Sequence, residues 1–297
     1  MKKILSLCFF TLIFQLYLNG SLQAQEATGT SLLDLVKDTI PQVDYISNAF
    51  KSTRIINGQS IEMLGTGSLD FRILHRFGPI NSGAGQFFGL DQASIRFSFD
   101  YAINNDLLIG IGRSSARKEL DGFIKYRLLH QSTGAREMPV SVVLVAGATC
   151  WTTPFADPTI ANYFTSRLGF FQQILVGSKI SDFITLQLSP TLIHRNLVDS
   201  SSIPHDIYAL GFGGRIRLTN RVSLTFDWYH PFNGMTKGVN FDPLAIGFDI
   251  ETGGHVFQVH LSNSVGMNER SFITETYNNW AKGGIQLGFN ISRIFQL

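Results

Sequence analysis

The feature of this sequence that most constrains its fold is an alternation of apolar and polar residues, which recurs from residue 67 to residue 297. A period of two is that of a β-strand whose two faces meet different surroundings. Each alternating segment has about ten residues, the length of a tilted strand that crosses a membrane. We predict strands at 67–77, 93–103, 107–114, 121–131, 140–149, 164–180, 183–194, 206–218, 222–230, 244–252, 254–262 and 283–297. An even number of strands, here twelve, is expected of a single-chain outer-membrane barrel.

The links between these segments differ in length in a regular way. Every second link is short, and these are 104–106, 131–138, 181–182, 219–221 and 252–254. The other links are mostly longer, and these are 78–92, 151–163, 195–205, 231–243 and 263–282. Short periplasmic turns and long outer loops are typical of outer-membrane barrels. A soluble sandwich of two sheets, the alternative fold, does not predict this alternation.

The first 24 residues have the pattern of a secretory signal peptide. Lys2 and Lys3 precede an apolar run at 4–18, and Ala24 ends a stretch of small and polar residues. Without this segment the basic and acidic residues are equal in number, so nucleic-acid binding gains no support. Cys150 is then the only cysteine, which excludes an intramolecular disulfide. No later apolar stretch approaches the roughly 18 residues of a membrane helix, so a membrane-spanning chain must close a barrel.

Residues 25–66 carry a weaker signal than the rest of the chain. Residues 31–37 could form a short helix, and residues 43–64 have strand character without regular alternation. We favour an N-terminal periplasmic arm or a plug inside the barrel. The alternative is one more hairpin, which would raise the strand number to 14. The predicted organisation is therefore a signal peptide at 1–24, an arm or plug at 25–66 and a barrel at 67–297.

The last strand alternates up to the final residue, with Phe289, Ile291, Phe295 and Leu297 on one side. Bacterial barrels often end in such a strand, which the barrel-assembly machinery reads. We therefore expect this machinery and outer-membrane lipid as partners. Arg293 falls on the lipid-facing side, but so near the end of the strand an exposed cation costs only about 0–1 kcal/mol.

Six stretches of the chain carry a family resemblance. They are STRIINGQSIE at 52–62, FRILHRFG at 71–78, FGLDQASIR at 88–96, IGIGRSS at 109–115, DGFIKYRLLHQ at 121–131 and DIETGGHVFQ at 249–258. The chain resembles the outer-membrane β-barrels of Bacteroidota grouped as domain of unknown function 5777. The resemblance implies an outer-membrane barrel, and this family has no established activity. Gln59 stands where many relatives would have His, so the resemblance implies no metal role there.

The charged residues of the strands lie mainly on the side opposite the large apolar ones. Lipid exposure of Arg or Lys at mid-membrane costs about 2–4 kcal/mol, so these residues should line the lumen. The predicted lumen residues are Arg72, Arg76, Arg96, Asp100, Lys125, Arg127, Arg167, Arg215, Arg217, Asp227, Asp249 and Glu251. They could pair to brace the interior, or they could form a polar path for small solutes. Arg72, Arg76, Arg96, Lys125 and Arg127, opposed there by Asp70 and Asp100, predict a positive wall and a modest preference for anions.

No residue pattern points to catalysis, a metal or a cofactor. His255 and His260 have opposite parities and cannot bind one metal from a regular strand. An outer-membrane phospholipase would need a serine beside a rim histidine such as His75, His194 or His230, and no strand-borne serine fits. We therefore predict a non-enzymatic barrel, which acts as a narrow small-solute channel or transporter. The alternative is a scaffold that binds a partner protein through its outer loops or N-terminal arm. The sequence leaves the solute and the oligomeric state open.

Overall fold

The computed structural model describes residues 42–155, 157, 159, 161–198 and 203–297. The predicted signal peptide at 1–24 and the predicted helix at 31–37 lie outside these residues. Within them, every helix is too short or too polar to cross a lipid bilayer.

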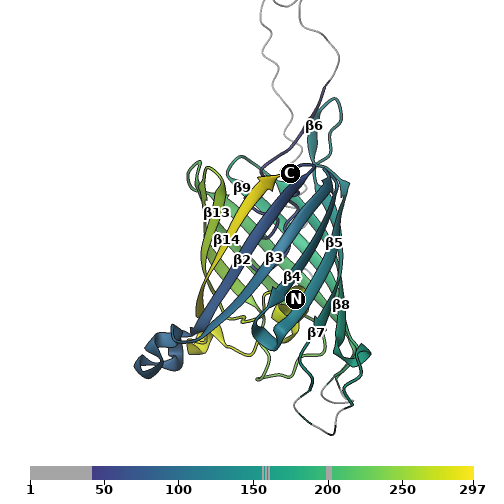
Figure 1. Ribbon diagram of the computed structural model, residues 1–297. Helices are drawn as coiled ribbons and strands as arrows, with labels where there is room; N and C mark the ends of the chain where they lie inside the picture. The colour runs from purple at the N-terminus through teal and green to yellow at the C-terminus, as the bar shows by residue number, and fades with distance from the viewer. Residues whose placement is uncertain (1–41, 156, 158, 160, 199–202) are drawn as a thin grey trace, which may run out of the picture. The chain divides into compact units, whose positions relative to one another are not determined.

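Twelve antiparallel strands close a barrel in the described part of the chain, as the sequence predicted (Figure 1). Strands that follow one another in the barrel sequence pair side by side, and the pairing of the last with the first closes the wall. The barrel strands are β2 (Ser68–Pro79), β3 (Ala93–Asn104), β4 (Leu107–Ser114), β5 (Glu119–Leu129), β7 (Ser141–Trp151), β8 (Leu168–Lys179), β9 (Ile184–Arg195), β10 (Asp206–Arg217), β11 (Val222–Pro231), β12 (Leu244–Thr252), β13 (His255–Ser262) and β14 (Gln286–Gln296).

The alternative of fourteen barrel strands is wrong. The extra strands, β1 (Val43–Tyr45) and β6 (Ser132–Gly134), pair only with each other in a separate two-stranded sheet. β6 belongs to the link between β5 and β7, which is one of the short turns. Figure 1 shows β6 at the same end of the barrel as the C-terminus. We call this end the short-turn end and the opposite end the long-loop end.

Short helices interrupt the links between strands. They are η1 (Ile80–Ser82), η2 (Ala84–Gly89), η3 (Ala116–Lys118), η4 (Thr165–Arg167), α2 (Glu269–Thr274) and η5 (Trp280–Lys282). They explain where strands begin later than predicted. β8 starts at Leu168 instead of residue 164 because the three residues before it form η4. β14 starts at Gln286 instead of residue 283 because Gly283 and Gly284 still belong to the turn that ends η5, in which Gly284 N donates to Asn279 O.

The two faces of the wall differ as the alternation predicted. Along β2 every inward residue is buried, including Asp70, Arg72 and Arg76, whereas every outward residue is partly exposed. Outward apolar side chains such as Phe97 and Phe99 are more than 40% exposed. An apolar outer surface and a wall of closed hydrogen-bond ladders are what lipid requires of a barrel.

Apolar side chains also meet inside the barrel. Phe50, Ile55 and Ile61, which precede the first barrel strand, belong to one buried cluster with Phe123 and Phe272. Small wall residues make room for such side chains, because a Cβ at Gly110 would overlap the ring of Phe123. The core of this barrel is therefore supplied in part by segments outside its wall.

Candidate functional site

The residues predicted to line the lumen fall into two groups. Eight of them are at most 5% exposed: Arg72, Arg76, Arg96, Asp100, Lys125, Arg215, Asp227 and Asp249. The other four lie toward the two ends of the barrel: Arg127, Arg167, Arg217 and Glu251.

The four outer members of this set have partners at the rims. Arg127 donates through Nε to Asp106 at 2.8 Å, in the turn between β3 and β4. The guanidinium of Arg217 lies over the ring of Phe183 at 4.9 Å. Glu251 forms an ion pair with Lys51. Arg167 lies in η4, before its predicted strand begins.

Residues 49–64, which we call the lumen segment, lie among the inward side chains of the wall. Ile55, Ile56 and Asn57 are at most 2% exposed. The segment turns back on itself, because Ile55 N donates to Gly58 O at 2.8 Å and Ser60 N donates to Thr53 O at 3.0 Å. Gly58 is required at this turn, since a Cβ there would overlap the hydroxyl of Tyr229 on β11. Residues 25–41 of the predicted arm or plug lie outside the described residues.

Asp227 on β11 binds the tip of the lumen segment. Its Oδ2 accepts hydrogen bonds from the backbone N–H of Ile56, Asn57 and Gly58 at 3.2, 2.7 and 3.0 Å. Its Oδ1 accepts a fourth from the Asn57 side chain at 3.3 Å. Successive N–H groups that converge in this way form an anion-binding nest. Here the anion is a carboxylate of the wall itself.

Other charged wall residues hold the segment by its carbonyl groups. Lys125 Nζ donates to Glu62 O at 2.7 Å and to Thr53 O at 3.2 Å. Arg215 Nη1 donates to Asn48 O at 2.7 Å and to Ala49 O at 3.0 Å. These two cations donate to backbone carbonyl oxygens that, in a β-strand, would accept from a neighbouring strand.

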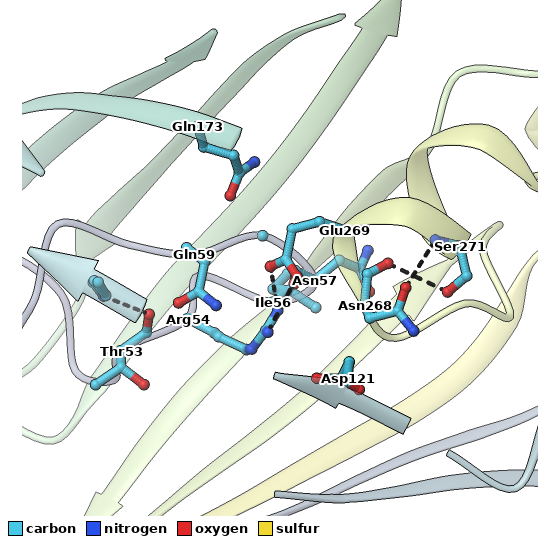
Figure 2. Close-up of polar contacts among 12 residues, drawn as sticks. Thr53, Arg54, Ile56, Asn57, Gln59, Asp121, Gln173, Asn268, Glu269 and Ser271 are labelled. Atoms are coloured by element: carbon cyan, nitrogen blue, oxygen red, sulfur yellow. Dashed lines mark hydrogen bonds and ion pairs between the residues drawn. The ribbon is translucent and has the colours of Figure 1, made fainter. Parts of the chain in front are cut away.

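A buried ion pair joins the lumen segment to the last long loop. Arg54 donates through Nη1 to Glu269 Oε1 at 2.8 Å and through Nη2 to Oε2 at 3.4 Å. Both side chains are 1% exposed. Glu269 is the first residue of α2, and Asn268 caps this helix by accepting from Ser271 N at 2.9 Å. Figure 2 shows Arg54 reaching toward Glu269 at the start of the helix.

α2 is also tied to the wall. Arg270 donates to Glu119 Oε1 on β5 through Nη2 at 2.7 Å and through Nε at 3.0 Å. Asn268 Nδ2 donates to the other oxygen of Glu119 at 2.8 Å. The ring of Phe272 meets that of Tyr229 edge-on, with 5.0 Å between centroids. The loop that carries α2 therefore folds into the lumen from the long-loop end, while the lumen segment enters from the short-turn end.

The excess of positive charge on the wall is smaller than the sequence suggests. Asp121 and Glu119 share the inward parity of β5, and both are buried. Asp121 accepts from Arg96 Nε at 2.9 Å and from Nη2 at 2.5 Å. Arg72 pairs with Asp70 at 2.6 Å. Most of the wall cations thus have a partner, either a carboxylate or a carbonyl of the lumen segment.

Cavities remain at both ends of the filled lumen. At the short-turn end one of about 570 Å³ lies between residues 45–47, the last turn of the lumen segment and the β5–β7 link. Another of about 400 Å³ adjoins Lys51 and Glu251. At the long-loop end a cavity of about 50 Å³ is lined by arginines and Trp151. Several buried polar atoms, among them Arg72 Nη1 and Asp100 Oδ1, have no protein partner in the described chain, and such atoms are normally hydrated.

The histidines make no metal centre among the described residues. His194 Nδ1 contacts Asp206 at 2.7 Å, and His230 Nδ1 contacts Asp242 at 2.9 Å, so each of these two rim histidines has an acidic partner. His260 is buried and shares neither the face nor the exposure of His255.

Several important residues were missed by sequence reasoning. Glu119 lies just before the predicted start of its strand, and Arg54, Glu269 and Arg270 lie outside all predicted strands. The acidic residue that follows Asn268 is a helix-start signal that could have been read. No local signal indicates that this loop folds inward.

Three solved structures similar to the chain are the NanC porin, the KdgM porin and an outer membrane channel from Pseudomonas putida F1. The NanC porin is 7% identical with a TM-score of 0.49, and the match covers 77% of this chain and 100% of that one. The KdgM porin is 7% identical with a TM-score of 0.45, over 77% and 99% of the two chains. The Pseudomonas channel is 15% identical with a TM-score of 0.47, over 79% and 98%.

No protein of curated function matches the chain in sequence. A family described as a membrane bound beta barrel domain matches residues 50–295. The match includes nearly all of the lumen segment and the barrel strands up to the last residues of β14. The chain therefore belongs to the membrane bound beta barrel domain family DUF5777.

Proposed function

We propose that this protein is a narrow, gated channel for small solutes in the outer membrane. In the described conformation the lumen segment closes this channel, and the Arg54–Glu269 pair joins the segment to α2. The observation that carries this proposal is the chemistry of the contact between wall and segment. Asp227, Lys125 and Arg215 are charged groups of the wall that bind backbone groups of the segment, among them Asn57 N, Glu62 O and Ala49 O.

A lumen that served only as a solid core would not need such charges. Replacing buried ionic groups by apolar residues of similar size is often neutral or stabilising. Charged wall groups can instead be hydrated once the segment leaves, because water replaces each backbone partner. Because water competes as a partner, a hydrogen bond contributes only about 0.5–1.5 kcal/mol net to stability, or about 1.5–3 kcal/mol when one group is charged. The segment can therefore leave the wall at a moderate cost for each contact.

The path of the chain also allows the segment to leave. Before the segment, Ile46 N donates to Gln131 O at 2.9 Å, and after it Thr66 N donates to Asn105 at 3.1 Å. Both anchors lie in turns of the short-turn end, which faces the periplasm in an outer-membrane barrel. The segment therefore enters and returns through one mouth, and it can withdraw as a loop without threading the barrel.

The test is ion current through the purified protein in a planar bilayer. A variant in which a short Gly-Ser link replaces residues 49–64 should conduct steadily. The wild type should stay closed, with brief openings of the same unit conductance. A control variant that lacks residues 83–88, in the long loop after β2, should behave as the wild type.

Every variant must first run faster unboiled than boiled on a denaturing gel, which shows a folded barrel. A folded deletion variant without current would contradict the channel. A wild type that never opens, beside a conducting deletion variant, would make the lumen segment a permanent plug. Either result would favour the scaffold that binds a partner protein.

A further inference from the structure

The cavity at the long-loop end has a composition unlike that of the other cavities. Its charged lining consists of Arg117, Arg167, Arg195, Arg270 and a single carboxylate, Glu275. Glu119 lies behind Arg270 and offsets part of its charge. Among the described residues at this cavity, four guanidinium groups lie together with two carboxylates, so arginine is the main charged group of the lining.

The fold places these arginines together for a simple reason. Glu119 pairs with Trp151 across β5 and β7, Cys150 with Leu168 across β7 and β8, and Gly169 with Arg195 across β8 and β9. Four adjacent strands therefore end at the same height. Trp151 and Arg195 have the inward parity of β7 and β9, and Arg167 lies in η4 directly before β8, so the cavity opens toward the lumen and not toward lipid.

Arg117 and Arg270 both lie against one aromatic ring. The guanidinium carbons of Arg117 and Arg270 lie 4.4 and 4.8 Å from the ring centre of Trp151. Both arginines also bind Glu275, at 3.1 and 2.7 Å. These contacts fix the two side chains in place before any ligand arrives, which reduces the entropy lost on binding.

Donors remain in this cavity after the protein contacts are made. Neither Trp151 Nε1 nor Arg167 Nε, both buried, has an acceptor among the described residues. Among the described residues, Arg167 makes one long hydrogen bond, from Nη1 to Thr152 O at 3.4 Å, and its guanidinium lies 5.9 Å from the ring centre of Phe164. A planar guanidinium presents paired N–H groups that match the two oxygens of a carboxylate or phosphate.

From this geometry we infer that the cavity is a binding site for an oxyanion, either a carboxylate or a phosphate group of a small soluble molecule. The cavity of about 50 Å³ admits one such group, with the rest of the molecule in the outer mouth. The inference deepens the proposed function, on which it rests for its role in transport, by naming anionic solutes as the class that enters. The binding itself does not depend on conduction.

The test uses the fluorescence of Trp151 in the full-length protein. Replacing Trp228 and Trp280 by Phe leaves Trp151 as the sole tryptophan. Titration with inorganic phosphate in lipid-free detergent should give a saturable change, which chloride at equal ionic strength does not give. Arg167→Gln should weaken phosphate binding by about tenfold or more, because a lost charged hydrogen bond is worth about 1.5–3 kcal/mol.

Two variants serve as controls. Arg221→Gln removes an exposed arginine from the opposite end of the barrel and should leave the affinity unchanged. Arg167→Lys keeps the positive charge but loses the paired N–H donors of the guanidinium, so it should bind phosphate with intermediate affinity. Equal affinity in Arg167→Gln and Arg221→Gln, or no saturation at all, would overturn the inference.

A second arm separates a soluble anion from a lipid phosphate. The protein is placed in nanodiscs of phosphatidylcholine with or without phosphatidylglycerol, and phosphate is then added. If phosphatidylglycerol alone changes the Trp151 signal and phosphate does not compete, the site is a lipid site and the inference is wrong. The fluorescence readout does not depend on ion current. A protein that does not conduct could therefore still bind phosphate at this cavity, and a protein that does not bind phosphate could still be a channel.

Discussion

Replacing Asp227 by Asn should loosen the lumen segment without opening the wall. The substitution keeps the shape of the side chain and removes the charge that faces Ile56, Asn57 and Gly58. It also places an amide nitrogen at one of the two oxygen positions. At the Oδ1 position that nitrogen would face the Asn57 Nδ2 donor, and at the Oδ2 position it would face three N–H groups.

The size of the effect follows from the contacts. A hydrogen bond to a charged group is worth about 1.5–3 kcal/mol, against about 0.5–1.5 kcal/mol for a neutral one. Three bonds that each lose about 1 kcal/mol give about 3 kcal/mol in total, even if all three survive. Since every 1.4 kcal/mol is tenfold in an equilibrium constant, the open population of the segment should rise by about a hundredfold.

Hydrogen–deuterium exchange of the amides at 55–58 measures this population, because exchange from a folded protein requires local opening. The matched control is Asp249→Asn on the neighbouring strand β12, whose carboxylate accepts from the wall residues Thr225 and Gln258. It makes the same chemical change in the same wall. Unchanged exchange in Asp227→Asn, or equal acceleration in Asp249→Asn, would refute the anchoring role of Asp227.

Three further predictions concern the turn at Gly58, the docking of β1 at the short-turn end and the pairing of β14 with β2. Gly58→Ala should raise the same exchange rates because its Cβ meets the Tyr229 hydroxyl, and Tyr229→Phe should partly restore protection in the double variant; a lack of any rescue would contradict the contact. Burial lowers the pKa of His130, which stacks on Tyr45 at 4.8 Å, so the protonated form is disfavoured when β1 is docked. Docking of β1 should therefore be complete above the ordinary pKa of histidine, near 6.5, and should weaken as the pH falls below it. We therefore compare amide exchange at residues 44–46 in the wild type and in His130→Gln, after correcting both for the intrinsic pH dependence of exchange. Between pH 7.5 and pH 5 the exchange should accelerate more in the wild type. An equal change in both proteins would contradict the role of His130. Deleting Phe295–Leu297 removes the last pairing of β14 with β2, so outer-membrane levels on immunoblots should drop sharply, and normal levels would show that this end is dispensable.

The wall of this barrel could be read from the sequence because its physics is local. β4 and β12 match their predicted bounds, since turn residues flank them and the alternation is uninterrupted. The start of β8 was predicted four residues too early because Arg167 keeps the parity of the strand although the backbone there already forms η4. Parity alone cannot show where a strand ends.

The interior could not be read in the same way. The lumen segment is surrounded on all sides, so it has no polar face and no alternation. Its backbone groups bond to side chains such as Asp227 and Lys125, which lie far away in the sequence. Arg270 and Glu119 are likewise 151 residues apart. Such pairs depend on which loop folds inward, and a single sequence carries no local sign of that choice.

The pair Arg54–Glu269 links two segments that enter the lumen from opposite ends. If one segment left without the other, the remaining segment would keep a buried charge without its partner. Removing one partner of a buried ion pair costs about 3–5 kcal/mol. States that are open at only one end are therefore disfavoured, and the two segments should move together. Arg270 follows Glu269 directly and lines the arginine cavity of the long-loop end. An anion bound there acts on α2, and through the Arg54–Glu269 pair it acts on the lumen segment. Such a ligand can shift the gate only to the extent that it binds one position of α2 more tightly than another.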